Sequence, residues 1–314
     1  MSTAVHSEIK PAGIPRQLLA PRWWPAWLAL GLLWLLAFVP MPLLRLFGAG
    51  LGELFRLAVP SRRRIVRINL GLCFPELDEA TRRRMARDHF RALGIGLFEV
   101  PLAWFASDRR LLRMVEFEGV EHLRQAQADG SGVLLLTGHF TTMELGCRLV
   151  HLAGFPFHGM YRRANNVFAD YWMCRLREAR LGLPMVPKED LKRIVRLLRG
   201  GGRIWYGPDQ TIDAPGAVFV PFFGEPVLTL TATSRLAQMG RARVVPYFPQ
   251  RRGGRYKLVF RPALENFPGG DDSADAARIN QLLEQAIREV PEQYFWVHRR
   301  FKDGPPGRRN PYAR

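Results

Sequence analysis

A histidine and a carboxylate lie five positions apart, directly after an apolar run that predicts a buried β-strand. The run covers residues 133–136, and His139 and Glu144 follow it. Because ligands bind at the carboxyl ends of the strands in open α/β sheets, a reactive side chain is expected at this edge. An imidazole beside a carboxylate can remove a proton from a hydroxyl group near neutral pH. The pair therefore predicts general-base catalysis, in which neutral His139 activates an acceptor hydroxyl for attack on a thioester.

The spacing restricts how these two side chains can meet. At about 100° per residue, positions five apart on one helix do not share a face. His139 is therefore expected in a loop and Glu144 in the first turn of a helix, where Thr141 and Glu144 fit a capping box. From there Glu144 could fix the tautomer of His139 and stabilise its protonated form. The alternative is that Glu144 only caps the helix.

Two further polar residues follow predicted strands and are candidates for the same site. Arg162 comes after residues 157–161, and Asp209 comes after residues 203–206. Arg162 could bind a substrate phosphate or polarise the thioester carbonyl; the alternative is a structural ion pair with Asp209 or Glu144. Asp209 could position Arg162 or a sugar hydroxyl, or it could simply form a turn.

Several other chemistries are not favoured. The chain has no G-x-S-x-G elbow, which weighs against a serine hydrolase. Its other histidines show no metal-ligand spacing, so no metal is expected. The three cysteines are scattered and form no CxxC pair, which predicts reduced thiols in place of a disulfide framework.

Strands and helices alternate along most of the chain, which predicts an αβα layered domain with a mixed, largely parallel sheet. The expected strands are residues 133–137, 157–161, 203–206, 218–222, 244–248 and 256–260. The expected helices are residues 79–105, 119–128, 143–153, 166–181, 188–199, 227–239 and 275–289.

An uncharged stretch near the N-terminus predicts a membrane-anchoring helix. It covers residues 23–44 and holds four of the 8 tryptophans, and Pro40 and Pro42 would end or kink it. Its 22 residues could extend about 33 Å as a helix. A full span, a hairpin in one leaflet and a buried core helix remain open. The chain thus divides into an arm (1–22), the anchor and a catalytic domain (45–314) whose first part is basic and helical.

The charge balance indicates acidic partners. There are 46 Lys and Arg against 28 Asp and Glu, giving a net charge of +18. Such a surface attracts nucleic acid, anionic lipid or an acidic carrier protein. Arginines gather after the uncharged stretch, including residues 62–64 and 82–84, which places the domain on the cytoplasmic side. Residues 294–302 mix aromatic and basic side chains, which fits contact with anionic lipid better than nucleic-acid binding.

Several blocks of sequence together carry a resemblance to a known family. They are the tryptophan-rich stretch, residues 69–76 (NLGLCFPE), the His139-x4-Glu144 block, Tyr161-Arg162, Pro208-Asp209-Gln210, and residues 291–302 (PEQYFWVHRRFK). With these blocks, from about Pro21 onward, the chain resembles the late acyltransferases of lipid A biosynthesis. These are the lauroyl and myristoyl transferases that act on Kdo2-lipid IVA, within the lysophospholipid acyltransferase superfamily.

The resemblance implies a reaction and a set of site residues. By it, His139 and Glu144 match the catalytic dyad, and Arg162 and Asp209 match substrate-binding positions. A lauroyl- or myristoyl-like chain would pass from acyl carrier protein to the hydroxyl of a 3-hydroxyacyl chain on a lipid A precursor, without a cofactor. Glycerolipid members of the superfamily usually carry Asn and Asp where this chain has Gly138 and Glu144, and no Pro-Glu-Gly-Thr block follows. A lysophospholipid or another glycolipid is the alternative acceptor.

The resemblance also implies partners and a location. The acyl carrier protein, the lipid A precursor and an anionic membrane surface are the expected partners, and nucleic acid is not. The expected location is the inner membrane, with the catalytic domain on its cytoplasmic face.

Overall fold

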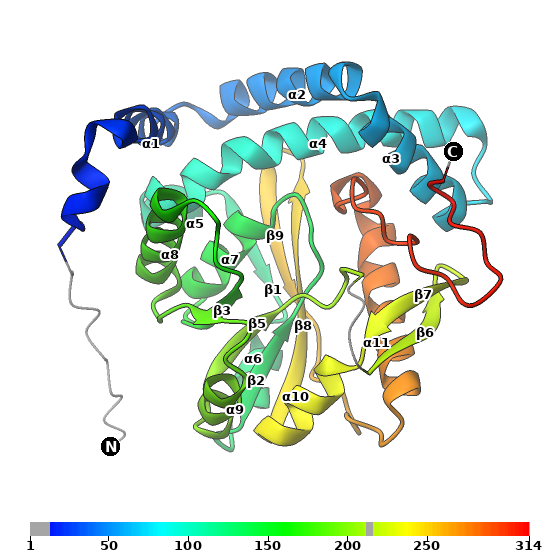
Figure 1. The fold of residues 1–314 in the computed structure, drawn as a ribbon. Helices are drawn as coiled ribbons and strands as arrows, with labels where there is room; N and C mark the ends of the chain where they lie inside the picture. The colour runs from blue at the N-terminus through cyan, green and yellow to red at the C-terminus, as the bar shows by residue number, and fades with distance from the viewer. Residues whose placement is uncertain (1–12, 212–215, 314) are drawn as a thin grey trace.

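A seven-stranded mixed sheet lies at the centre of the protein (Figure 1). The computed structural model describes residues 13–211 and 216–313. The strands, in spatial order, are β1 (Val115–Glu118), β9 (Arg255–Phe260), β8 (Ala242–Arg252), β2 (Gly132–Leu136), β5 (Arg203–Tyr206), β3 (His158–Tyr161) and β4 (Val186–Pro187). Neighbours pair in parallel except β8 with β9. This confirms the predicted mixed, largely parallel sheet.

Helices cover both faces of the sheet, as its central strand requires. Every residue of β2 is buried, with Val133 and Leu135 in one hydrophobic cluster and Leu134 and Leu136 in the other. The cluster of Val133 includes residues of α5 (Asp108–Leu112), α6 (Val120–Ala126), α7 (Met143–Leu152), α8 (Val167–Leu181) and the second half of α4 (Glu79–Phe105). The cluster of Leu134 includes residues of α3 (Pro60–Cys73), α9 (Leu191–Arg199), α10 (Ala232–Gly240) and α11 (Asp272–Glu289).

The uncharged stretch 23–44 is divided between two helices. Helix α1 (Trp24–Leu36) ends before Pro40, and α2 (Met41–Ala58) begins after it with Pro40 at its N-cap position. No helix within residues 13–211 and 216–313 has both the length and the apolar character needed to cross a membrane. The anchoring role of this stretch stays a prediction, and residues 1–12 of the N-terminal arm lie outside the described part of the chain.

Helix α2 packs backbone to backbone on α4, which lies across one edge of the sheet (Figure 1). A Cβ atom placed on Gly94 of α4 would lie only 2.0 Å from the carbonyl oxygen of Gly48 in α2, so glycine is required for this approach. Helix α4 is fixed in turn by its buried Glu99. That carboxylate accepts hydrogen bonds from the Arg251 guanidinium at 2.7 and 2.9 Å and from the Tyr256 hydroxyl at 2.7 Å.

A two-stranded hairpin replaces the first turn of one predicted helix. Residues 227–230 belong to β7 (Glu225–Leu230), which pairs antiparallel with β6 (Ala217–Phe222), so the prediction of helix from residue 227 was wrong. The turn residues Phe223 and Gly224 have φ angles of 51° and 78°. Positive φ at both central positions is the geometry that tight hairpins favour.

Candidate functional site

His139 is bound at two points by Asp209. The backbone N–H of His139 donates to Asp209 Oδ2 at 2.7 Å, and its ring Nδ1 lies 2.5 Å from Oδ1. Strands β2 and β5 are parallel neighbours, so the loops that follow them leave the sheet at the same edge. Two residues 70 positions apart are thereby brought into direct contact.

The pair holds a proton in a defined place. Burial acts to raise the pKa of Asp209, but the neighbouring His139 ring and its N–H donors outweigh this and lower that pKa to about 2. Burial likewise acts to lower the pKa of His139, and the Asp209 charge outweighs it, so the pKa of His139 is raised. Because Asp209 is ionised, the Nδ1 of His139 carries the hydrogen, and Nε2 is left to accept a proton.

A buried arginine supports Asp209 from a distance. Arg300 is 2% exposed and donates to the hydroxyls of Thr211 and Thr229 at 3.0 Å and to the carbonyl of Leu228 at 2.8 Å. Burial lowers the pKa of Arg300, while its charge contributes to keeping Asp209 ionised. In the sequence, Arg300 lies in the aromatic and basic segment 294–302 and in the block 291–302 of the family resemblance, but neither pattern connected it with the site.

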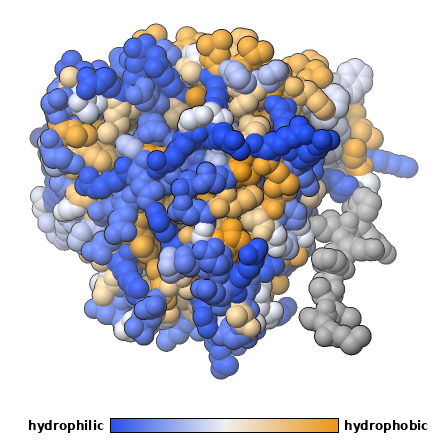
Figure 2. Space-filling model, turned by 180° about the vertical axis from the view of Figure 1, so that it is seen from behind, coloured by the Kyte–Doolittle hydropathy of each residue, from blue (hydrophilic) through white to orange (hydrophobic). Residues whose placement is uncertain are grey.

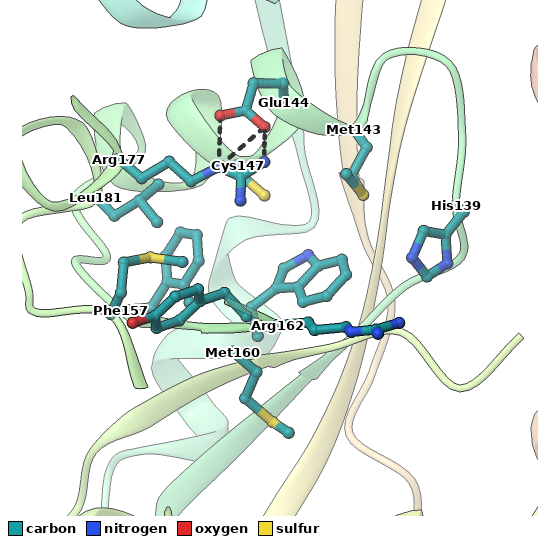
Figure 3. A pocket seen from close by; sticks show the side chains of 13 residues that line it. His139, Met143, Glu144, Cys147, Phe157, Met160, Arg162, Arg177 and Leu181 are labelled. Atoms are coloured by element: carbon teal, nitrogen blue, oxygen red, sulfur yellow. Dashed lines mark hydrogen bonds and ion pairs between the residues drawn. The ribbon is translucent and has the colours of Figure 1, made fainter. Parts of the chain in front are cut away.

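Glu144 binds other partners than the sequence predicted. It accepts hydrogen bonds from Arg177 Nε at 2.9 Å and Nη2 at 2.7 Å, and from Trp104 Nε1 at 2.6 Å. Figure 3 shows its carboxylate directed to Arg177, with His139 across the cavity. The predicted contact between Glu144 and His139 is replaced by the one with Asp209.

The predicted capping box does not form either. Helix α7 begins at Met143, its N-cap residue is Thr142, and no side chain caps it. The hydroxyl of Thr142 donates instead to the carbonyl of Pro249 at 3.1 Å. The explanation that Glu144 only caps the helix is therefore wrong, because its carboxylate is occupied by Arg177 and Trp104.

His139 lies at the edge of an apolar cavity of about 190 Å³ (Figure 3). Most of the side chains around it are apolar or aromatic: Met143, Phe157, Met160, Tyr161, Leu181, Met185 and Trp205. The ion pair of Glu144 and Arg177 forms a polar part of its wall. Cys147 also lines it, but burial raises the pKa of this thiol to about 12, so it remains protonated and is a poor nucleophile.

A second, larger cavity of about 820 Å³ adjoins the first at His139, and we call it the basic cavity because three of its four charged residues are cations. The cations are Arg162, Lys188 and Arg235, beside Glu189, and apolar side chains such as Leu236 and Met239 complete the lining. The two cavities share five residues: His139, Met160, Tyr161, Arg162 and Trp205. Arg162 is exposed, and no salt bridge joins it to a described residue, so the alternative of an ion pair with Asp209 or Glu144 is not borne out. The arrangement suits a reaction in which an apolar chain and an anionic group meet at one imidazole.

Two side chains at this site could not be predicted from any motif in the sequence. Arg177 lies in the middle of α8 and Trp104 near the end of α4, without a motif around either. Their contact with Glu144 depends on how two helices pack against α7, which residue spacing does not define.

Comparison with known proteins shows the family to which the chain belongs. Residues 12–303 match the family model described as bacterial lipid A biosynthesis acyltransferase. The lipid A biosynthesis lauroyltransferase of Escherichia coli (strain K12) is 41% identical over 92% of this chain and 95% of its own length. The palmitoleoyltransferase of the same organism is 36% identical over 95% of this chain and 97% of its own length, and its myristoyltransferase is 30% identical over 94% and 92%.

Proposed function

Because the chain belongs to the bacterial lipid A biosynthesis acyltransferase family, we propose that it transfers a fatty acyl chain from acyl carrier protein to a hydroxyl of a lipid A precursor. The acceptor is the hydroxyl of a 3-hydroxyacyl chain on a molecule of the Kdo2-lipid IVA type. The observation that carries the proposal is the position of His139, paired with Asp209, between an apolar and a basic cavity.

In the proposed mechanism, His139 acts as the general base. Its Nε2 removes the proton of the acceptor hydroxyl, and the resulting oxygen attacks the thioester carbonyl. The tetrahedral intermediate then expels the thiolate, which takes the proton from the imidazolium, so that an ester and a free thiol are formed. Asp209, held ionised by His139 and Arg300, keeps Nδ1 protonated and stabilises the imidazolium.

The two cavities divide the substrates by polarity. We assign the transferred acyl chain to the apolar cavity, because a hydrocarbon chain gains about 0.8 kcal/mol for each methylene removed from water. We assign phosphate groups of the substrates to the basic cavity, where Arg162 can pair with a phosphate or with the developing oxyanion. Glu144 then orders the wall of the apolar cavity through Arg177, and Asp209 orients the base.

An exposed apolar surface on α1 and α2 supports membrane contact for the same reaction. Met41, Leu44, Gly48 and Gly52 are the buried residues of α2. The large apolar side chains of α2 that point outward are Leu43, Leu46, Phe47, Leu51, Leu54 and Leu57. Figure 2 shows hydrophobic residues gathered along the upper edge of the molecule, the side on which α2 lies. Apolar surface of this extent marks interaction sites, and a helix lying in the membrane interface fits it.

The test of the proposed function is a transfer assay. The purified protein is incubated with acyl carrier proteins bearing chains of different length and with three acceptors: a lipid A precursor, a lysophospholipid and a lipid-linked sugar. Product mass should show one acyl chain added to the lipid A precursor and little or none to the other two. Transfer to the lysophospholipid alone would overturn the assignment of the acceptor.

A further inference from the structure

A third cavity lies away from His139, between α2, α4 and the C-terminal segment. Its volume is about 430 Å³, within the range of small-molecule sites. Most of its lining is apolar or glycine: Leu51, Gly52, Phe55, Leu93, Gly94, Leu97, Phe295 and Val297. Arg62 and His298 are its two polar members, and burial lowers the pKa of His298 to about 4, so that its ring is neutral.

One wall of this cavity is the segment that supports the catalytic loop. The backbone N–H of Phe295 donates to the carbonyl of His139 at 3.0 Å. The Nε2 of His298 accepts from the backbone N–H of Thr211, two residues after Asp209, at 3.2 Å. A molecule in the cavity would therefore lie one segment of chain away from the reacting groups.

The opposite side of the cavity reaches the exposed apolar surface. Leu97 on α4 is 56% exposed and Leu51 on α2 is 41% exposed, although both line the cavity. Leu51 also belongs to the outward-facing apolar residues of α2. Arg62 lies at this cavity with one guanidinium nitrogen donating to the carbonyl of Val297 at 3.1 Å, and it forms no salt bridge with a described residue. The cavity thus connects an exposed apolar surface, a cation that has no salt bridge among the described residues, and the catalytic loop.

We propose that this cavity holds an acyl chain of the acceptor lipid other than the chain that is acylated, with Arg62 available to a phosphate of the same molecule. The inference rests on the proposed function, because only an acceptor with several chains needs a place for one of them while another reaches His139. No described residue forms a salt bridge with Arg62, and the phosphate of a glycolipid would be an anionic partner for it. The two cavities beside His139 are assigned to the transferred chain and to phosphate groups, and this third cavity opens to the exposed apolar surface of α2 through Leu51.

The inference is tested with a substitution that narrows the cavity at its exposed end. In Leu97→Trp, the larger side chain competes with the bound chain, so the KM for a multi-chain lipid A precursor should rise about tenfold, a loss of about 1.4 kcal/mol of binding. The kcat should change little, because binding that is equal in ground state and transition state affects KM alone. For a 3-hydroxyacyl glucosamine phosphate with one chain, KM should stay the same. Leu112→Trp, an exposed leucine on α5 outside the three cavities, is the matched control.

Photolabelling gives a second measurement that does not depend on a variant. A lipid A precursor with a diazirine in a chain that is not acylated should label residues 51–55, 93–97 or 295–298 of the wild-type protein. Unlabelled precursor should remove the label, and phosphatidylglycerol in the same micelles should not. An unchanged KM in Leu97→Trp, an equal rise for both acceptors, labelling elsewhere, or displacement by phosphatidylglycerol alone would each overturn the inference. If the wild-type protein transfers no chain to the precursor, the proposed function fails instead, whatever the labelling shows.

Discussion

At the scale of single residues, the site depends on which carboxylate accompanies His139. Asp209 receives both the backbone N–H and the ring Nδ1 of His139, whereas Glu144 binds Arg177 and Trp104. A histidine with an ionised partner at Nδ1 is prepared to accept a proton at Nε2. The two carboxylates therefore have separate tasks, and their variants should behave differently.

The pH dependence of the rate distinguishes the two carboxylates. In the wild-type protein kcat/KM should fall as the pH drops below the pKa of His139, which Asp209 raises above its ordinary value of 6.5. Asp209→Asn removes that charge, so the pKa of His139 falls and the acidic limb of the pH profile of kcat/KM moves to lower pH. The plateau value of kcat/KM should also drop roughly 10²- to 10⁴-fold. Glu144→Gln should leave the position of the limb unchanged. A limb that moves in Glu144→Gln and stays in Asp209→Asn would reverse the assignment.

The depth of the apolar cavity should depend on Gly159. A Cβ atom at this position would lie 2.7 Å from Met185 Sδ and 3.3 Å from Leu181 Cδ1, so Gly159→Ala displaces two side chains that line the cavity and adds a methyl group to its wall. We expect the variant to prefer donors with shorter chains than the wild-type protein does, measured by competition between acyl carrier proteins of different chain length. In the control Gly71→Ala, the new methyl group meets no atom within 4 Å, and the preference should not change. An unaltered preference in Gly159→Ala would place the transferred chain elsewhere.

At the scale of elements, the layer formed by α2 and α4 is fixed to the sheet by one buried carboxylate. Glu99→Ala leaves Arg251 buried without its partner, which typically costs about 3–5 kcal/mol of unfolding free energy. Urea unfolding measures this loss. The surface pair of Glu118 with the partly exposed Lys257 is the control, because removing such a pair changes stability by about 0–1 kcal/mol. Equal losses in Glu99→Ala and Glu118→Ala would contradict the role given to Glu99.

Much of the element order could be predicted from the sequence, because hydrophobic periodicity reports burial directly. The buried run of β2 and the long helix 79–105 are examples that the structure confirms. The prediction placed residues 227–230 in a helix because it missed the hairpin turn at Phe223 and Gly224. Their pairing with β6 depends on that turn. A glycine between two apolar runs was the available signal for that turn.

The site could be predicted in part for a similar reason. Strand ends are visible in sequence, so His139, Arg162 and Asp209 were all expected at one edge of the sheet, and the structure brings His139 together with both of the others. Which carboxylate His139 binds could not be predicted, because nearness in sequence favoured Glu144. The pairing follows from β2 lying beside β5 and from α8 packing on α7, which are properties of the tertiary structure.

At the scale of the whole molecule, the apolar surface of α2 and the net charge of +18 should both contribute to the affinity for anionic membranes. Leu46→Ser and Leu54→Ser each remove an outward-facing leucine. Each should lower the affinity for phosphatidylglycerol vesicles, measured by co-sedimentation, about tenfold or more. Leu112→Ser is the matched control. Added salt should weaken binding further, because it screens the attraction of arginines to anionic headgroups. Vesicle binding that is unaffected by both leucine variants would mean that another surface contacts lipid.

The most direct measurement of the central claim compares wild-type protein with His139→Ala in acyl transfer to a lipid A precursor, with product mass as readout. The circular dichroism spectrum and unfolding midpoint of the variant serve to establish that it is folded. Loss of a general base should lower turnover roughly 10²- to 10⁴-fold without removing the affinity for the acyl donor. A folded His139→Ala protein that transfers the chain at nearly the wild-type rate would contradict the account.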